Sequence, residues 1–317
     1  MGNVDLKPVD MVEIVTLTDN FVDLTSMDNS EVLFRAAPLR GNEFSNSILA
    51  EHGFSALVRM TDSGITDSMI LDFGLSEDAA ARNAEALNLD LSQVAAAALS
   101  HGHIDHFGGM AKVGAMVGKT VPLAVHPAAF QERRWMEPFP EFEILMPVIT
   151  REEAARAGFT PIESAKPLPM LDGRVLFLGE IERTTDFEKG MPNAFRTENG
   201  QKVPDPLEDD TSLVMHLKGK GLVVLSGCAH SGIVNTVRYA QKVTGVNEVF
   251  AVMGGFHLGG PAFATAIPPT VAAIKDIGPR YVIPTHCTGR DAQSVFKREM
   301  PGAFLLNMAG TTLRFAV

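Results

Sequence analysis

The chain has 317 residues, 45% of them hydrophobic and 21% charged, a composition that excludes a disordered chain, a collagen-like fibre and a coiled coil. The net charge of −11 argues against nucleic acid as a partner, because an acidic surface repels phosphate backbones. The two cysteines, Cys228 and Cys287, imply no disulfide framework. A chain of this length buries a large core without such cross-links.

The sequence shows no pattern that indicates a membrane segment. The first nine residues contain Asp5 and Lys7 and no apolar run, so no signal peptide is expected. The longest apolar stretch, residues 94–99, is too short to span a bilayer. We therefore expect a cytoplasmic protein that acts on a small molecule and has neither membrane nor nucleic acid as a partner.

Strand and helix patterns alternate along the chain. The first half predicts, in order, strands at 12–16, 55–60 and 69–73, a helix at 77–87 capped by Ser76, a strand at 94–99, a helix at 108–117 and a strand at 121–125. The second half predicts strands at 212–217, 221–225, 249–253 and 281–284, with helices at 234–243 and 270–277. Residues 126–169 and 184–209 are irregular in pattern, and we expect them to be long loops that shape a pocket. This alternation is typical of an α/β protein with two similar halves.

Histidines gather where one predicted strand ends. The run His101-Gly102-His103-Ile104-Asp105-His106 follows the strand at 94–99 and precedes a glycine-rich entry to a helix. Imidazole and carboxylate are the usual ligands of zinc and of non-haem iron. Three imidazoles and a carboxylate on one buried loop would each cost free energy if left unpaired, and a shared metal ion removes that cost. The run therefore predicts a metal site.

Two further strand ends carry the same kind of side chain. Cys228 and His230 follow the apolar strand at 221–225, and His286 follows the strand at 281–284. In open α/β sheets, ligands collect at the ends of the strands. His257 follows Gly254-Gly255 and is expected to line the pocket as a proton donor or a ligand. His52, His126 and His216 are weaker candidates, and His126 and His216 are interpreted as structural.

The His-x-His-x-Asp-His run resembles the signature of the metallo-β-lactamase superfamily, and Leu71-Asp72-Phe73-Gly74 resembles its first motif. Other segments resemble one branch, labelled 7,8-dihydropterin-6-methyl-4-(β-D-ribofuranosyl)-aminobenzene-5′-phosphate synthase-like. These segments are 51–55, 179–181, 226–235, 254–258 and 286–289. The resemblance implies a four-layer αββα sandwich, which we expect to form a single domain over residues 1–317 with halves at about 1–175 and 176–317.

The resemblance also implies residue roles. His101 and His103, with a third histidine, would hold one metal ion, and Asp105, His106 and His286 would hold a second. Asp72 would orient the histidine loop. Many relatives have a bridging aspartate where Cys228 stands here, and a histidine where Asp209-Asp210 stands. We therefore expect His230 to supply the missing imidazole, with Asp210 and Cys228 as candidate additional ligands. Zinc is the expected metal, at one or two ions per chain, with manganese and iron as alternatives.

These features favour a metal-dependent hydrolase in which a metal-bound hydroxide attacks a small-molecule ester, lactam, lactone or phosphoester, with Asp105 and His257 as catalytic residues. The alternative follows the branch label: a transferase that joins a pterin pyrophosphate to an aminobenzene ribotide. Three other classes rank lower. His103 stands where diiron oxidoreductases of this fold carry a glutamate, the acidic charge disfavours a nuclease, and the full ligand set disfavours a binding module without activity. Arg133, Arg134 and Arg290 are the cationic candidates for an anionic substrate.

Overall fold

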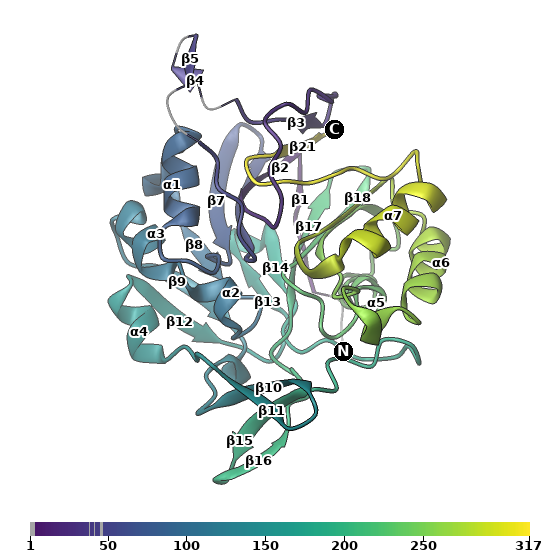
Figure 1. Cartoon of the computed structure of the whole chain (residues 1–317). Helices are drawn as coiled ribbons and strands as arrows, with labels where there is room; N and C mark the ends of the chain where they lie inside the picture. The colour runs from purple at the N-terminus through teal and green to yellow at the C-terminus, as the bar shows by residue number, and fades with distance from the viewer. Residues whose placement is uncertain (1–3, 38, 41, 45–46) are drawn as a thin grey trace.

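The computed structural model describes residues 4–37, 39–40, 42–44 and 47–317 of the chain. Two large sheets dominate the described part (Figure 1). The first has eight strands in the order β12 (Phe159–Glu163), β9 (Val121–Val125), β8 (Ala96–Ala98), β7 (Ile65–Leu71), β6 (Ser55–Asp62), β2 (Met11–Thr18), β21 (Thr312–Ala316) and β3 (Leu33–Phe34).

The second sheet has seven strands. Six follow the order β13 (Leu168–Met170), β14 (Val175–Phe177), β17 (Ser212–Leu217), β18 (Gly221–Ser226), β19 (Val249–Gly255) and β20 (Tyr281–Thr285), and β1 (Pro8–Val9) pairs with β17. The strands β18, β19 and β20 are parallel, so their carboxyl ends meet at one edge of the sheet. That edge holds much of the candidate site.

Helices cover the outer face of each sheet (Figure 1). On the first sheet these are α1 (Ala79–Ala86), α3 (Met110–Val117) and α4 (Arg151–Arg156), with α2 (Ile104–Phe107) in the histidine run; on the second they are α5 (Ile233–Thr244), α6 (Ile267–Ile277) and α7 (Arg290–Glu299). Short 3₁₀ turns lie at Leu91–Gln93, Pro127–Ala129, Leu171–Gly173, Pro261–Phe263 and His286–Thr288. None of the helices in the described residues is long and apolar enough to cross a membrane.

The core lies between the two sheets. Ile14 and Met69 of the first sheet pack in one cluster with Met215, Leu225 and Ile283 of the second, all fully buried. Two further clusters lie between each sheet and its helices. Burial of each such side chain contributes roughly 1.5–3 kcal/mol relative to exposure. This arrangement of helices, sheet, sheet and helices confirms the expected αββα sandwich.

The two halves exchange strands. The C-terminal strand β21 pairs with β2 and β3 in the first sheet, and the N-terminal strand β1 pairs with β17 in the second. The sheet boundary therefore does not follow the expected division at residue 175, since β13 and β14 also belong to the second sheet. Residues 1–3 of the expected domain lie outside the described residues. The single-domain organisation stays a prediction.

The prediction of two irregular loops was wrong. The segments 126–169 and 184–209 supply β10 (Arg134–Phe139), β11 (Phe142–Met146), β15 (Ala194–Glu198) and β16 (Gln201–Pro204), which form a four-stranded antiparallel sheet, together with α4 and β12. Pro138 falls at a register shift in β10, where a missing N–H is tolerated. β10 pairs with β11 in a local hairpin, whereas its other partner, β15, lies about sixty residues later, so no local pattern reveals that second pairing. A small sheet of β4 (Leu39–Arg40) and β5 (Glu43–Phe44) completes the fold.

Candidate metal centre

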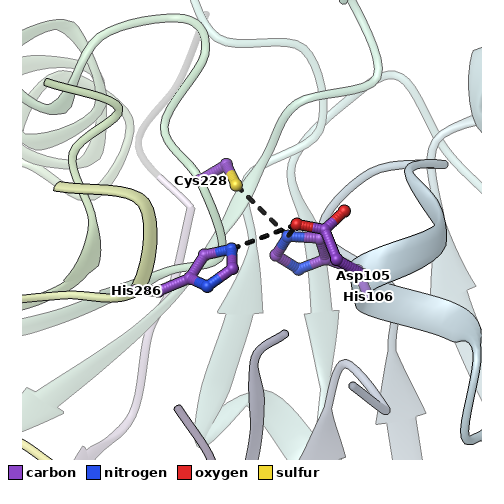
Figure 2. Close-up of side chains that lie close together, drawn as sticks. All are labelled: Asp105, His106, Cys228 and His286. Carbon is purple, nitrogen blue, oxygen red and sulfur yellow. Dashed lines mark hydrogen bonds and ion pairs between the residues drawn. The ribbon is translucent and has the colours of Figure 1, made fainter. Parts of the chain in front are cut away.

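Four strand ends bring the candidate side chains together. His101 follows β8, Cys228 and His230 follow β18, His257 follows β19, and His286 follows β20. They meet at the edge between the two sheets, where Asp105 and His106 project from α2 (Figure 2). Residues separated by up to 185 positions in the sequence therefore share one site, because β18, β19 and β20 are neighbours in the second sheet and His101 follows β8 of the first.

One group combines Asp105, His106, Cys228 and His286, whose ligand atoms all lie within 4.8 Å of one another. Oδ2 of Asp105 is 3.5 Å from Nε2 of His106 and 3.3 Å from Nε2 of His286. Sγ of Cys228 is 3.2 Å from Nε2 of His106. Figure 2 marks this contact with a dashed line. Three of the four residues are buried, and Asp105 is partly exposed.

A second group combines His101, Cys228 and His230 within the same 4.8 Å limit. Nε2 of His101 is 3.2 Å from Nε2 of His230 and 3.0 Å from Nδ1 of His103. Only one nitrogen of each such pair is able to donate, so the other must accept. Cys228 belongs to both groups, so its sulfur stands between the two sets of imidazoles.

Carboxylates behind the imidazoles fix their orientation. Oδ2 of Asp72 lies 2.7 Å from Nδ1 of His106 and accepts a hydrogen bond from the Ser100 hydroxyl, while Oδ1 accepts from the Ser100 N–H, also at 2.7 Å. Asp19 accepts from the N–H of His286 at 3.0 Å and from the side chain of Asn307 at 2.7 Å. A carboxylate on a ring nitrogen, as Asp72 is on His106, sets the tautomer of a ligand histidine and raises its basicity, whereas Asp19 holds the backbone of His286.

The histidine loop is anchored on its other side by a buried ion-pair network. Oδ2 of Asp209 accepts from the N–H of Gly102, and Oδ1 accepts from Nη2 of Arg134, both at 2.8 Å. Nε of Arg134 lies 3.1 Å from Oδ2 of Asp205. Arg134 and Asp209 are buried, so Arg134 of β10 connects the four-stranded sheet to the candidate site. Arg134 is therefore placed for structure, whereas Arg133 is exposed.

Burial and neighbouring charges shift the pKa values of the site. Burial lowers the pKa of His103 to about 4 and that of His257 to about 3, and it lowers the pKa values of His101 and His230 well below the usual range. Burial also lowers the pKa of His106, but Asp105 and Asp72 outweigh it and raise the value well above normal. Four of the imidazoles are thus neutral near pH 7, the form in which histidine binds a metal.

The backbone around the site adopts unusual conformations. Asp72, Ala229, His257 and His286 have φ values of 58°, 53°, 43° and 49°. Residues with a β-carbon pay roughly 1–2 kcal/mol to enter this left-handed region. Such strain persists only where the surrounding structure holds it, and it is concentrated at functional sites.

The donor set fits a transition metal. Imidazole and thiolate suit zinc, and a carboxylate extends the choice towards manganese and iron. Nδ1 of His230 and Oδ1 of Asp210 are buried without a hydrogen-bond partner among the described residues, and buried groups of this kind are normally satisfied. Burial raises the pKa of Asp210 to about 6. The structure therefore supplies candidate metal-ligand groups, and it leaves the identity of the metal open to experiment.

The structure gathers most of the predicted site residues. Those that belong to the two ligand groups are Asp105, His106, Cys228, His286, His101 and His230. His103 lies against His101 without belonging to either group, and Asp210 accepts from the N–H of Ser231 at 2.9 Å. The ring of His257 packs 4.3 Å from that of His230. Their roles as metal ligands and catalytic groups remain proposals.

Sequence reasoning underrated His52 and did not single out Asp19. Nε2 of His52 lies 3.8 Å from Oδ2 of Asp105, and its ring is 5.1 Å from that of His286. The side chain is 63% exposed, so it marks where the site meets solvent. No local pattern flags either residue, because their partners are distant in sequence.

The ring of His126 instead accepts from the N–H of Ala128 and begins a 3₁₀ turn, and His216 lies within β17.

Comparison with known proteins agrees with this geometry. Residues 41–239 match the family model of the metallo-beta-lactamase superfamily. A 7,8-dihydropterin-6-methyl-4-(beta-D-ribofuranosyl)-aminobenzene-5'-phosphate synthase of Methanocaldococcus jannaschii is 30% identical over 93% of this chain and 99% of its own. Among solved structures, Tm1679, described as a metal-dependent hydrolase of the beta-lactamase superfamily, is 25% identical with a TM-score of 0.72, covering 96% of this chain and 99% of its own. Zinc-bound PqqB of Methylobacterium extorquens is 12% identical with a TM-score of 0.53, covering 95% and 99%, and it shows the fold alone.

The expectation of a hydrolase is overturned by the curated relative, although the structural neighbour Tm1679 is described as a hydrolase. The curated relative that matches nearly the whole length of both chains is a synthase. The histidine run indicated hydrolysis because activation of water is the commonest use of such a site, yet the same ligands serve other reactions. With its sandwich fold, its His-x-His-x-Asp-His run at a strand end and a family match over most of its length, the chain belongs to the metallo-beta-lactamase superfamily.

Proposed function

We propose that this protein is a synthase that joins a dihydropterin to an aminobenzene ribotide. The observation that carries the proposal is the 30% identity to the methanogen synthase, over 93% of this chain and 99% of that one. Segments that resemble the same branch lie at the site itself, in the turn from Ser226 to Asn235 and in the loop from Gly254 to Leu258.

The reaction is a condensation. The amine nitrogen of the aminobenzene ribotide attacks the 6-methylene carbon of a dihydropterin that carries pyrophosphate on that carbon. A carbon–nitrogen bond forms, the carbon–oxygen bond to pyrophosphate breaks, and the nitrogen loses one proton. Pyrophosphate leaves with the bonding electrons. The reaction needs no oxidant and no water.

The two ligand groups are the proposed metal sites. Asp105, His106, Cys228 and His286 would hold one ion, and His101, Cys228 and His230 would hold another beside His103. A divalent metal held there would supply Lewis acidity that neutralises the charge gathering on the leaving pyrophosphate. Asp72 and Asp19 would hold His106 and His286 in the required orientations.

His257 is the proposed acceptor of the proton that the amine loses. Its ring lies beside that of His230 and is neutral near pH 7, since burial lowers its pKa to about 3. Nδ1 of this ring is buried and has no hydrogen-bond partner among the described residues, so it is available to a substrate.

The test is product formation from the two substrates. Purified protein loaded with zinc, manganese or iron is incubated with the dihydropterin pyrophosphate and the aminobenzene ribotide 5′-phosphate, and mass spectrometry measures the condensed product while a coupled assay measures pyrophosphate. We expect equal amounts of both. His257→Gln is expected to lower kcat by about 10²-fold or more with unchanged metal content, and His216→Gln, on β17, is the control.

A panel of ester, lactone, lactam and phosphodiester substrates separates synthesis from hydrolysis. Metal-loaded protein is expected to give no turnover on this panel. Absence of condensed product from protein with a full metal content would contradict the proposal, and so would product that forms equally well after removal of the metal.

A further inference from the structure

A cavity of about 600 Å³ adjoins the candidate metal centre and is not part of it. His286 belongs to both, because its Nε2 faces Asp105 while its ring also lines the cavity. Nδ1 of His286 is 3.1 Å from Oδ1 of Asn20, another lining residue. The cavity therefore touches the metal centre at His286 alone and is lined on from there by residues of α7.

One wall of the cavity is a polar and cationic face of α7. Arg290, Gln293, Ser294 and Lys297 all line it, at positions i, i+3, i+4 and i+7, which share one face of a helix. Arg290 and Lys297 lie two turns apart, about 10 Å along the axis. The apolar side chains Phe21, Phe304 and Leu306 also line the cavity.

The two cations on this wall are not neutralised by the protein. Neither Arg290 nor Lys297 forms an ion pair within the described part of the chain, since the nearby carboxylate of Glu299 pairs with Arg298 and Lys275 instead. Asp19, the acidic residue of the cavity, is engaged by the N–H of His286 and by Asn307. Both cations are exposed to solvent, and two cations without ion pairs in a cavity that also has aromatic lining suit an anionic aromatic ligand.

We propose that this cavity binds the aminobenzene ribotide, with its 5′-phosphate held by Arg290 and Lys297. The assignment rests on the proposed function and adds to it the site at which one of the two substrates binds. The pyrophosphate of the other substrate adjoins the bond that breaks, so it must lie at the metal centre. The 5′-phosphate is remote from the reacting amine and needs a cationic site away from that centre. The α7 wall provides one, and the aromatic lining of the cavity suits the aminobenzene ring.

Calorimetric titration of the metal-loaded full chain tests the assignment. Three ligands are compared: the aminobenzene ribotide 5′-phosphate, the same compound without phosphate, and the dihydropterin pyrophosphate. Arg290→Gln and Lys297→Gln are each expected to weaken binding of the phosphorylated ribotide about tenfold. Binding of the other two ligands is expected to stay within twofold. Arg298→Gln is the matched control, because Arg298 is on the same helix but outside the cavity.

Three results would overturn the assignment: no binding of the phosphorylated ribotide to the wild type, equal binding of both ribotide forms, or a loss in the two variants confined to the pyrophosphate. The proposed function fails separately. If the wild type makes no condensed product but the phosphate-dependent losses are seen, the cavity assignment stands and the synthase proposal falls. If product forms and both variants keep the wild-type KM for the ribotide, the synthase proposal stands and the cavity assignment falls.

Discussion

The carboxylate of Asp72 lies directly behind the imidazole of His106, with Oδ2 of the first 2.7 Å from Nδ1 of the second and both side chains fully buried. The same carboxylate also receives both the N–H and the hydroxyl of Ser100, the residue before the histidine run. The Asp72 side chain, which follows β7, thus fixes the backbone where the histidine run begins and the orientation of the His106 ring. The turn that places Asp72 has a φ of 58°, so the chain accepts strain to put it there.

Asp72→Asn is expected to weaken metal binding by about 10–100-fold, because an amide neither holds the Nδ1 proton of His106 as strongly nor adds negative charge behind the ring. Competition with a chelator of known affinity measures the loss. Asp67→Asn, on β7 and paired at the surface with Arg174, is the control and should bind metal as the wild type does. Unchanged affinity in Asp72→Asn would show that the pair does not act on the metal.

Cys228→Ser is expected to remove a sulfur ligand that both groups share. Cobalt-substituted protein should show a thiolate-to-metal charge-transfer band in the near ultraviolet, and the variant should lose it, because the thiolate is the metal-binding form of cysteine. Cys287→Ser is the matched control. Its sulfur lies 3.6 Å from the carbonyl oxygen of Cys228 and belongs to neither ligand group. A band retained in Cys228→Ser would remove Cys228 from the ligand set.

The sequence was informative where the chemistry is local. Residue type and strand position are enough to identify two features as candidate ligands: the three imidazoles and Asp105 within six residues, and His286 at the end of an apolar strand. Asp19 and Arg134 do not, because their partners His286 and Asp209 are 267 and 75 residues away. β10 was missed although its partner β11 is adjacent in the sequence, because Pro138 breaks its strand pattern, and its second partner, β15, is distant. Substrate choice was likewise beyond the local pattern, since identical metal ligands serve hydrolysis and condensation.

Glu13→Gln is expected to lower the free energy of unfolding by about 1–3 kcal/mol at pH 7. Glu13 on β2 is 6% exposed and pairs with Arg59 of β6 at 2.9 Å and Arg314 of β21 at 2.7 Å. Burial raises the pKa of this carboxyl, but the two guanidinium groups outweigh it and lower the pKa below 4.5. Both arginines are partly exposed, so solvent reduces the contribution.

The difference in unfolding free energy between the wild type and Glu13→Gln depends on pH, because the pKa of Glu13 is lower in the folded protein. The unfolded chain binds the proton more readily, so the pair stabilises the fold above pH 4.5 and the contribution is lost as the pH falls through the folded value. Urea unfolding of the wild type and of Glu13→Gln at several pH values should give curves that converge in acid. A difference that stays constant as the pH falls well below 4.5 would mean that the charge of Glu13 is not the cause.

Arg134→Met is expected to destabilise the protein by about 3–5 kcal/mol, because it leaves Asp209 buried without a cation and Asp205 with only Arg196, 4.0 Å away. Methionine preserves the stem of the side chain, so the loss reports on charge more than on packing. Arg133→Met, one residue away and exposed, should stay within about 0.5 kcal/mol of the wild type. Denaturant unfolding measures both.

Since Asp209 also holds the N–H of Gly102, Arg134→Met should loosen the histidine loop and weaken metal binding even where the variant remains folded. Wild-type stability and metal affinity in Arg134→Met would together show that the four-stranded sheet does not support the site.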